Sequence, residues 1–142
     1  MEIDIKRYGI TNVPVDADSL FTFEKGLAGF EESKRFKLFH EEGSKSVFWL
    51  QSVDDVSLTF PVVSPDAIDV EYQIELSDEE GAQIGLESAE DAVIAIIVYR
   101  EGTDDGKIAA NTLSPLILNQ KTHKGMQKIL KNVEPKLLYR AN

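Results

Sequence analysis

Residues 47–55 read VFWLQSVDD, and this stretch decides the fold class. Its side chains alternate between two faces with a period of two, which is the spacing of a β-strand, and the strand is predicted over residues 47–52. One face carries Phe48 and Leu50, and the other carries Val47 and Trp49. Both faces are therefore largely apolar. Trp49, the single tryptophan of the chain, either packs in a second core layer or belongs to a face left open for a partner.

The same spacing recurs along the chain. It predicts further strands at residues 3–8, 20–23, 36–39, 58–64, 72–76, 93–99, 108–113, 115–119 and 127–130. Many short strands separated by turn residues are typical of an antiparallel sandwich or barrel. Helical signal is limited to two short turns at 77–80 and 88–91, where a serine precedes acidic residues as in a capping box. The chain is predicted to be mainly β.

A length of 142 residues predicts a single domain over residues 1–142, because two domains would each lack a sufficient core. The basic tail 131–142 has weak periodicity and is expected to fray. No cysteine is present, which excludes disulfides and thiolate metal sites. The amino terminus lacks an apolar signal region, and the apolar run at 92–99 is too short to cross a membrane. We expect a cytoplasmic protein without membrane contact.

Three strand segments carry more detailed expectations. The run at 93–99 is so apolar that both of its faces are expected to be buried. Pro61 cannot donate a ladder hydrogen bond, so it is expected at a sheet edge or a bulge.

The third segment, ANTLSPLILN at 110–119, is expected to turn Leu113, Leu116 and Leu118 inward. Asn111 and Asn119 lie at its ends, where side-chain amides can bond backbone groups.

Charge is distributed unevenly along the chain. The net charge is −10, yet residues 111–142 hold one acidic and six basic residues, while residues 1–110 hold 24 acidic and nine basic ones. An acidic body repels phosphate backbones and attracts basic proteins. Direct nucleic-acid binding is therefore not expected, and a protein partner is favoured.

No pattern of catalytic residues emerges. His40 and His123 fall in predicted turns without partner ligands at metal-binding spacing, so no metal or cofactor is expected. Adjacent acidic pairs such as Asp54-Asp55 point to opposite faces of a strand or lie in solvated turns, which does not favour an acid/base dyad. The sequence thus indicates a protein that is not an enzyme.

Binding has better candidates. The stretch FEKGLAGFE at 23–31 has two interpretations: Leu27 and Phe30 cover the core from a tight turn, or Phe30 is an exposed aromatic anchor with an acidic rim, as at interface hot spots. LTFPVVSPD at 58–66 is either a guarded edge strand or one offered to a partner.

Together FEKGLAGFE, FWLQSVDD, LTFPVVSPD and ANTLSPLILN, in this order and spacing, resemble the flagellar assembly factor FliW family. MEIDIKRYGI and NQKTHKGMQKIL are similar to the first strand and closing hairpin of that family, so the resemblance runs from residue 1 to about Leu130. Two departures stand out. AIDVEY at 67–72 has fewer aromatic residues than the family pattern, and Lys128 occupies a position where an apolar residue is expected.

The resemblance implies a small antiparallel β-barrel-like protein of the bacterial cytoplasm that is not an enzyme. Members of the family bind the RNA-binding regulator CsrA, relieve its repression of flagellin synthesis, and bind flagellin itself in a partner-exchange switch. They act on CsrA away from its RNA site. The partners expected for this chain are therefore a CsrA-type regulator and flagellin.

Charge and exposure, rather than a family contact set, select the expected partner-facing residues. These are Phe30, Glu31, Asp54, Asp55, Asp66, Glu71 and Asn111. Charge reversal at Asp54 and Asp55 is expected to slow association with the regulator and leave the fold intact. Two alternatives stay open: a small-ligand-binding barrel, which a buried apolar cavity would favour, and a hydrolase, which two converging carboxylates with displaced pKa values would favour.

Overall fold

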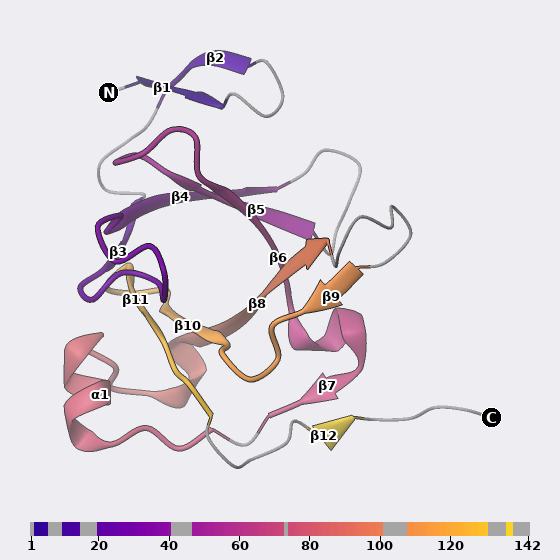
Figure 1. Ribbon diagram of the computed structural model, residues 1–142. Coiled ribbons are helices and arrows are strands. Elements are labelled where there is room, and N and C mark those ends of the chain that lie inside the picture. Colours follow the sequence, from indigo (N-terminus) through magenta and orange to yellow (C-terminus); the bar gives the residue numbers. More distant parts are fainter. Residues whose placement is uncertain are drawn as a thin grey trace.

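The computed structural model describes residues 2–5, 10–14, 20–40, 47–72, 74–100, 108–130 and 136–137 (Figure 1). Strands dominate this part of the chain: β1 (Glu2–Ile5), β2 (Ile10–Pro14), β3 (Leu20–Phe23), β4 (Arg35–His40), β5 (Val47–Ser52), β6 (Thr59–Val63), β7 (Val70–Glu71), β8 (Ala92–Arg100), β9 (Ile108–Ala110), β10 (Leu116–Asn119), β11 (Lys124–Gln127) and β12 (Lys136–Leu137). Helical structure is limited to α1 (Asp78–Gln83) and two 3-10 turns, η3 (Pro65–Ile68) and η4 (Ala89–Asp91).

Seven of these strands close into a barrel. Their order around the ring follows the chain: β3, β4, β5, β6, β8, β10 and β11. Neighbours run antiparallel except at the closing seam, where β11 pairs parallel with β3. An odd number of alternating strands leaves the first and last pointing the same way, so the seam has to be parallel. The predicted mainly β barrel is confirmed, with the refinement that it is mixed rather than wholly antiparallel.

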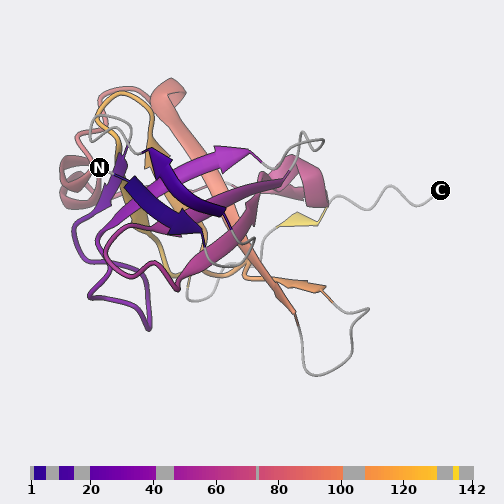
Figure 2. The ribbon, with the colours of Figure 1, turned by 90° about the horizontal axis from the view of Figure 1, so that it is seen from above.

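Accessory strands lie outside the ring. The β1–β2 hairpin forms its own sheet, and β7 pairs with β12. The second half of β8 pairs with β9, and Figure 2 shows this pair extending away from the barrel as an arm. Between β9 and β10 the chain advances six residues, from Ala110 to Leu116, while their partners on β8 are three residues apart. The ANTLSP segment is therefore an irregular insertion between two strands.

The barrel interior follows the period-two pattern. Phe23, Phe36, Leu50 and Leu116 are buried in one cluster, and the rings of Phe23 and Phe36 meet edge to face with centroids 5.4 Å apart. Such aromatic pairs add to the stabilisation that apolar burial supplies. The inward side chains of VFWLQSVDD are part of this core, as predicted.

A second cluster packs on the outer wall. Ile84, which follows α1, is buried with Ile117 and Met126 of the barrel wall. Asn119 is buried beside it: its Nδ2 donates to the carbonyl oxygen of Ile84 (2.9 Å), and its Oδ1 accepts from the backbone N–H of Lys121 (2.9 Å). The expectation that the Asn119 amide bonds backbone groups is confirmed.

The two predicted helical turns are also confirmed. Ser77 and Glu80 form a complete capping box at the start of α1, and the Ser88 side chain accepts from the Glu90 N–H at η4. Glu80 additionally receives Lys128 Nζ on both carboxylate oxygens, at 2.8 and 2.9 Å. This ion pair fastens α1 to the segment that follows β11.

Several strand predictions need correction. In the predicted strand 72–76, Tyr72 and residues 74–76 are not in a strand; the strand there is β7, which ends at Glu71. The predicted strand at 127–130 lies three residues too late, because β11 spans Lys124–Gln127. β2 was not predicted. Residues 72–76, YQIEL, alternate with a period of two, whereas residues 127–130, QKIL, do not, so local spacing by itself did not place either strand. Tyr8 lies outside the described residues.

Burial expectations also need correction. The run at 93–99 is not buried on both faces, because Val93 and Tyr99 are 37% and 50% exposed. Val93 stands at one mouth of the barrel, and Tyr99 lies on the arm. Leu113 does not point inward: it lies in the irregular insertion and is 48% exposed, whereas Leu116 and Leu118 are buried as predicted.

Pro61 lies in an interior strand rather than an edge strand, because β6 has β5 and β8 as neighbours. Its local setting nevertheless fits a missing donor. On the β8 side, only Val62 and Val63 of β6 are paired, so Pro61 is not part of the β6–β8 ladder. On the other side Pro61 faces Trp49, which is half-buried on the outer wall.

Candidate partner-binding site

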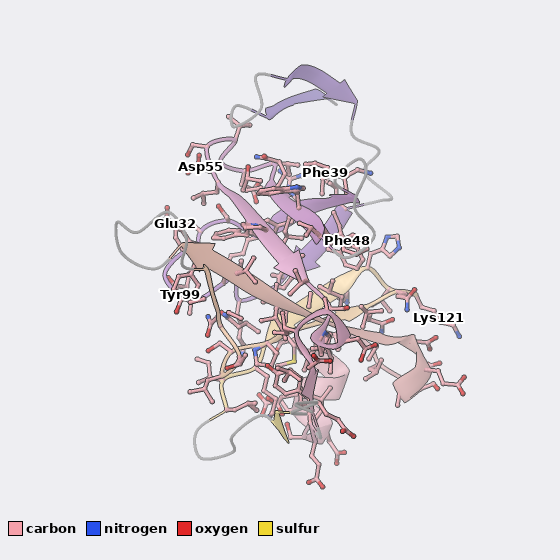
Figure 3. All side chains as sticks on the ribbon, turned by 90° about the vertical axis from the view of Figure 1, so that its right-hand side faces the viewer. Glu32, Phe39, Phe48, Asp55, Tyr99 and Lys121 are labelled. Carbon is pink, nitrogen blue, oxygen red and sulfur yellow. The ribbon has the colours of Figure 1, made fainter. Side chains whose placement is uncertain are left out.

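One end of the barrel carries a hollow of about 580 Å³ that we call the acidic hollow. The connection between β3 and β4 and the connection between β5 and β6 build it. Its lining residues are Gly29, Phe30, Glu31, Glu32, Ser33, Asp54, Asp55 and Leu58. Glu32 and Asp55 lie on the same side of the molecule in Figure 3. Four of the eight lining residues are acidic, so the hollow favours a positively charged group.

The β3–β4 connection is held by a tight turn. Gly26 has a φ of 68°, and an added Cβ there would lie 2.6 Å from Cα of Glu31. The Phe30 N–H donates to the Leu27 carbonyl oxygen (2.8 Å). Leu27 is buried in the core, while Phe30 is 40% exposed and packs on Phe60 with ring centroids 5.2 Å apart. Leu27 therefore covers the core, and Phe30 has one face available at the rim of the hollow.

Asp54 organises the floor between the two connections. Its Oδ2 accepts from the backbone N–H groups of Lys34 (2.9 Å) and Arg35 (3.0 Å), and its Oδ1 accepts from Nε and Nη2 of Arg35 (3.2 and 2.9 Å). Both oxygens are thus engaged within the chain. Asp54 has a structural task in addition to its charge, which the sequence did not indicate.

The neighbouring carboxylates are engaged less fully. Asp55 Oδ1 accepts from the N–H (3.0 Å) and hydroxyl (2.6 Å) of Ser57, and Glu31 Oε2 accepts from the Gly29 N–H (2.7 Å). Both side chains remain exposed. Their local bonds fix the carboxylates in position, which lowers the entropy lost when a partner binds.

The pKa values of two carboxylates in the hollow, those of Asp54 and Glu31, are lowered, which favours their charged state. Partial burial raises the pKa of Asp54, but hydrogen bonds from the Arg35 side chain and from the Lys34 and Arg35 N–H groups outweigh it, so its pKa lies below the ordinary value. The Gly29 N–H lowers the pKa of Glu31 in the same direction. A general acid needs a raised pKa, so this arrangement does not favour a hydrolase.

The other three expected residues lie elsewhere. Asp66 is in η3, Glu71 in β7, and Asn111 in the insertion after β9. Two of them approach each other, because the Tyr72 hydroxyl donates to the Thr112 carbonyl oxygen (2.5 Å) and so links the neighbours of Glu71 and Asn111. In Figure 1, β7 lies at the lower right and β3 at the left. The structure thus divides the seven residues between two surfaces.

Four lining residues of the hollow were not among the expected partner-facing residues: Gly29, Glu32, Ser33 and Leu58. Glu32 is exposed beside Glu31. Leu58 was assigned to a strand, but β6 begins at Thr59 and Leu58 closes the β5–β6 connection, where its N–H donates to the Asp55 carbonyl oxygen (3.0 Å). The adjacency of the two connections could have been found only from strand pairing.

Neither a metal site nor a membrane-spanning helix is found in the part of the chain that the structure describes. There, no group of three or more histidine and acidic residues could hold a metal ion. None of the helices described is long and apolar enough to cross a membrane.

Comparison with known families decides the assignment. The family model described as "FliW protein" matches residues 3–140. The chain belongs to the FliW family. This confirms the resemblance drawn from the four motifs and extends it beyond Leu130. FliW proteins are non-enzymatic assembly factors, which confirms the expectation that the chain is not an enzyme.

FliW relatives cover nearly the whole chain. "Flagellar assembly factor FliW" of Azoarcus sp. (strain BH72) is 39% identical over 135 residues, covering 92% of this chain and 91% of that protein. The protein of the same name from Thermotoga maritima (strain ATCC 43589 / DSM 3109 / JCM 10099 / NBRC 100826 / MSB8) is 32% identical over 125 residues, covering 88% and 84%. A solved structure, "Crystal structure of the flagellar assembly factor FliW", is similar with a TM-score of 0.82 and 28% identity, covering 99% and 96%. The mixed barrel is thus the FliW fold.

Proposed function

We propose that this chain is a cytoplasmic flagellar assembly factor that binds a CsrA-type translational regulator and flagellin. By binding the regulator it relieves repression of flagellin synthesis, and the two partners exchange on it. The observation that carries this proposal is the FliW family match over residues 3–140. The names of the relatives support the assembly role, and the resemblance in the sequence supports the two partners.

The acidic hollow supports the first partner by its charge. An RNA-binding regulator carries many lysine and arginine residues. In the hollow, Glu31, Glu32 and Asp55 place exposed carboxylates beside Phe30, which is 40% exposed. An aromatic centre with a charged rim combines apolar burial with electrostatic steering. We propose Phe30, Glu31, Asp54 and Asp55, together with Glu32, as the regulator-facing surface, with Asp54 acting as its support.

The three expected residues outside the hollow support a second contact with a partner protein. Asp66, Glu71 and Asn111 lie on or beside η3, β7 and the insertion before β10. We propose that these residues also face a partner. If the hollow takes the regulator and the second group takes flagellin, charge reversal at one surface should weaken one partner and spare the other.

Pull-down from a lysate, with mass spectrometry at two salt concentrations, tests the proposal first. We expect recovery of a CsrA-type protein and of flagellin, with the regulator lost more readily at high salt because exposed charges are screened. Recovery of neither protein would reject the proposed function.

A matched pair of variants tests the surface. Glu32→Lys reverses a charge in the hollow, whereas Glu75→Lys makes the same charge change at an exposed position outside it. We expect Glu32→Lys to slow association with the purified regulator about tenfold at low salt, and Glu75→Lys to change the rate much less. Equal association rates for both variants would remove the hollow from the binding surface.

A further inference from the structure

The end of the barrel opposite the acidic hollow is open and apolar. A cavity of about 260 Å³ lies there, which we call the apolar cavity. Phe21, Leu38, Phe48 and Val93 are among its lining residues. In Figure 3, Phe48 and Lys121 lie on one side of the molecule and Asp55 and Glu32 on the other.

The cavity exists because the interior packing is unequal along the barrel. Toward the acidic hollow, Phe23, Phe36 and Leu50 are completely buried. At the other end, Phe21, Leu38 and Phe48 pack against this core but stay only partly buried. The facing strand β8 contributes the short side chains of Val93 and Ala95, which leave the space across the barrel unfilled. Apolar surface is therefore left open to water, and its burial would be favourable.

The chemistry of the lining defines what would fit. Among the described residues that line the apolar cavity, none is charged, and the two polar ones, Ser64 and Gln120, are neutral. Ser64 occupies the N-cap position of η3, yet its side chain forms no capping hydrogen bond. A neutral hydroxyl or carbonyl group could meet these side chains at the rim, whereas a charged group would lose hydration without a counter-ion.

The volume of the apolar cavity limits the size of the ligand. A dry apolar cavity of about 150 Å³ accommodates benzene, so the larger volume here fits about two fused rings or a chain of comparable bulk. We propose that the apolar cavity binds a small neutral molecule with an apolar body of this size and one polar group. This site is separate from the proposed partner surfaces, and its existence does not depend on them.

A titration of the full chain with 2-naphthol, followed by amide NMR, tests the proposal. The probe is neutral at pH 7 and carries one hydroxyl on two fused rings. We expect saturable one-to-one binding, with the largest shifts at the cavity ends of β3, β4, β5 and β8. Absence of saturation, or shifts confined to the groove around Tyr72 and Leu86, would overturn the proposal.

A charged comparator tests the predicted chemistry without altering the protein. 2-Naphthoate has nearly the same shape but carries a negative charge at pH 7. We expect it to bind at least about tenfold more weakly than 2-naphthol, because none of the lining residues that the structure describes is cationic. Equal affinity for the two probes would contradict the inferred ligand class.

A filling variant tests the location. Val93→Phe places a ring in the mouth of the cavity, and Leu113→Phe adds the same ring at an exposed position outside it. We expect Val93→Phe to weaken 2-naphthol binding at least about tenfold and Leu113→Phe to leave it unchanged. Unchanged binding by a Val93→Phe protein with a native circular dichroism spectrum would exclude this cavity, and if that variant does not fold, the comparator result alone decides.

Discussion

At the scale of single residues, Asp54 is the position where structure changes the interpretation most. Its carboxylate accepts four hydrogen bonds that join the β3–β4 connection to the β5–β6 connection. The sequence predicted that reversing its charge would leave the fold intact. The observed bonds instead predict a cost in stability, because removing the carboxylate leaves two backbone N–H groups and the Arg35 side chain without their acceptor. Loss of binding in an Asp54 variant would therefore mix structural and electrostatic effects.

We predict that Asp54→Ala lowers the free energy of unfolding by about 1–2 kcal/mol, since hydrogen bonds to a charged acceptor are lost at a partly exposed site. Urea unfolding followed by Trp49 fluorescence measures this change. Glu32→Ala is the matched control, because Glu32 is exposed in the same hollow, and it should alter stability by less than about 0.5 kcal/mol. Equal effects for both variants would show that the Asp54 bonds contribute nothing.

Two glycines of the β3–β4 turn allow the cost of backbone strain to be measured apart from the cost of a steric collision. Gly26 and Gly29 both have positive φ, 68° and 86°, but an added Cβ collides with Glu31 only at Gly26 and meets nothing within 4 Å at Gly29. We predict that Gly29→Ala costs about 1–2 kcal/mol of unfolding free energy, and that Gly26→Ala costs about 2–4 kcal/mol. Thermal or urea unfolding of the two variants checks the order, and a larger cost at Gly29 would contradict it.

At the scale of elements, two sets of bonds hold the first turn of α1 in place. Glu80 serves the capping box with Ser77 and also pairs with Lys128 of the segment after β11. We predict that Ser77→Ala costs about 1 kcal/mol, and that a double-mutant cycle with Glu80→Gln and Lys128→Met gives a coupling of about 0.5–1 kcal/mol. Additive effects in that cycle would mean that the ion pair does not hold α1 to the barrel.

The elements also define what the sequence could predict. β3 and β5 have the bounds predicted from period-two spacing, and both serine caps were predicted from local chemistry. By contrast, β7 and β11 were misplaced. Their positions depend on pairing with distant partners, β12 and β3, which no local pattern contains. Long-range pairing therefore overrode local spacing.

The candidate site, too, could be predicted only in part from local sequence. Phe30 and Glu31 stand out locally as an aromatic residue beside acids after a glycine turn. Their proximity to Asp54 and Asp55 arises only because β4 pairs with β5 and brings the two connections together. The apolar cavity could not be predicted either, because it results from side chains that are too short to meet across the barrel.

At the scale of the whole molecule, stability should fall in acid. Hydrogen bonding holds the pKa of Glu80 below its ordinary value of 4.5 and that of Asp54 below 3.8. The unfolded chain therefore takes up protons before the folded chain does, so this stabilisation is complete above about pH 5 and is lost as pH falls through the lower folded values. Urea unfolding between pH 3 and 7 measures the loss. A Glu80→Gln variant should show a shallower dependence, and an identical dependence would contradict the assignment.

The parallel seam should be weaker than the β4–β5 pair. Only two residue pairs join β11 to β3, whereas five join β4 to β5. We predict that amide hydrogens at the seam, such as that of Thr22, which donates to the His123 carbonyl oxygen (2.9 Å), exchange faster than those shared by β4 and β5. Native-state hydrogen exchange by NMR checks this order, and equal protection would mean that the barrel opens as one unit.

The parallel direction of this seam also restricts how the chain could be re-engineered. β3 starts at the end that carries the apolar cavity, whereas β11 finishes near the acidic hollow, where the Gln127 side chain accepts from the Ala28 N–H (2.8 Å). A circular permutant that joins Gln127 directly to Leu20 therefore needs a linker that runs the full height of the barrel wall. Two-residue loops, sufficient for antiparallel neighbours, would be too short.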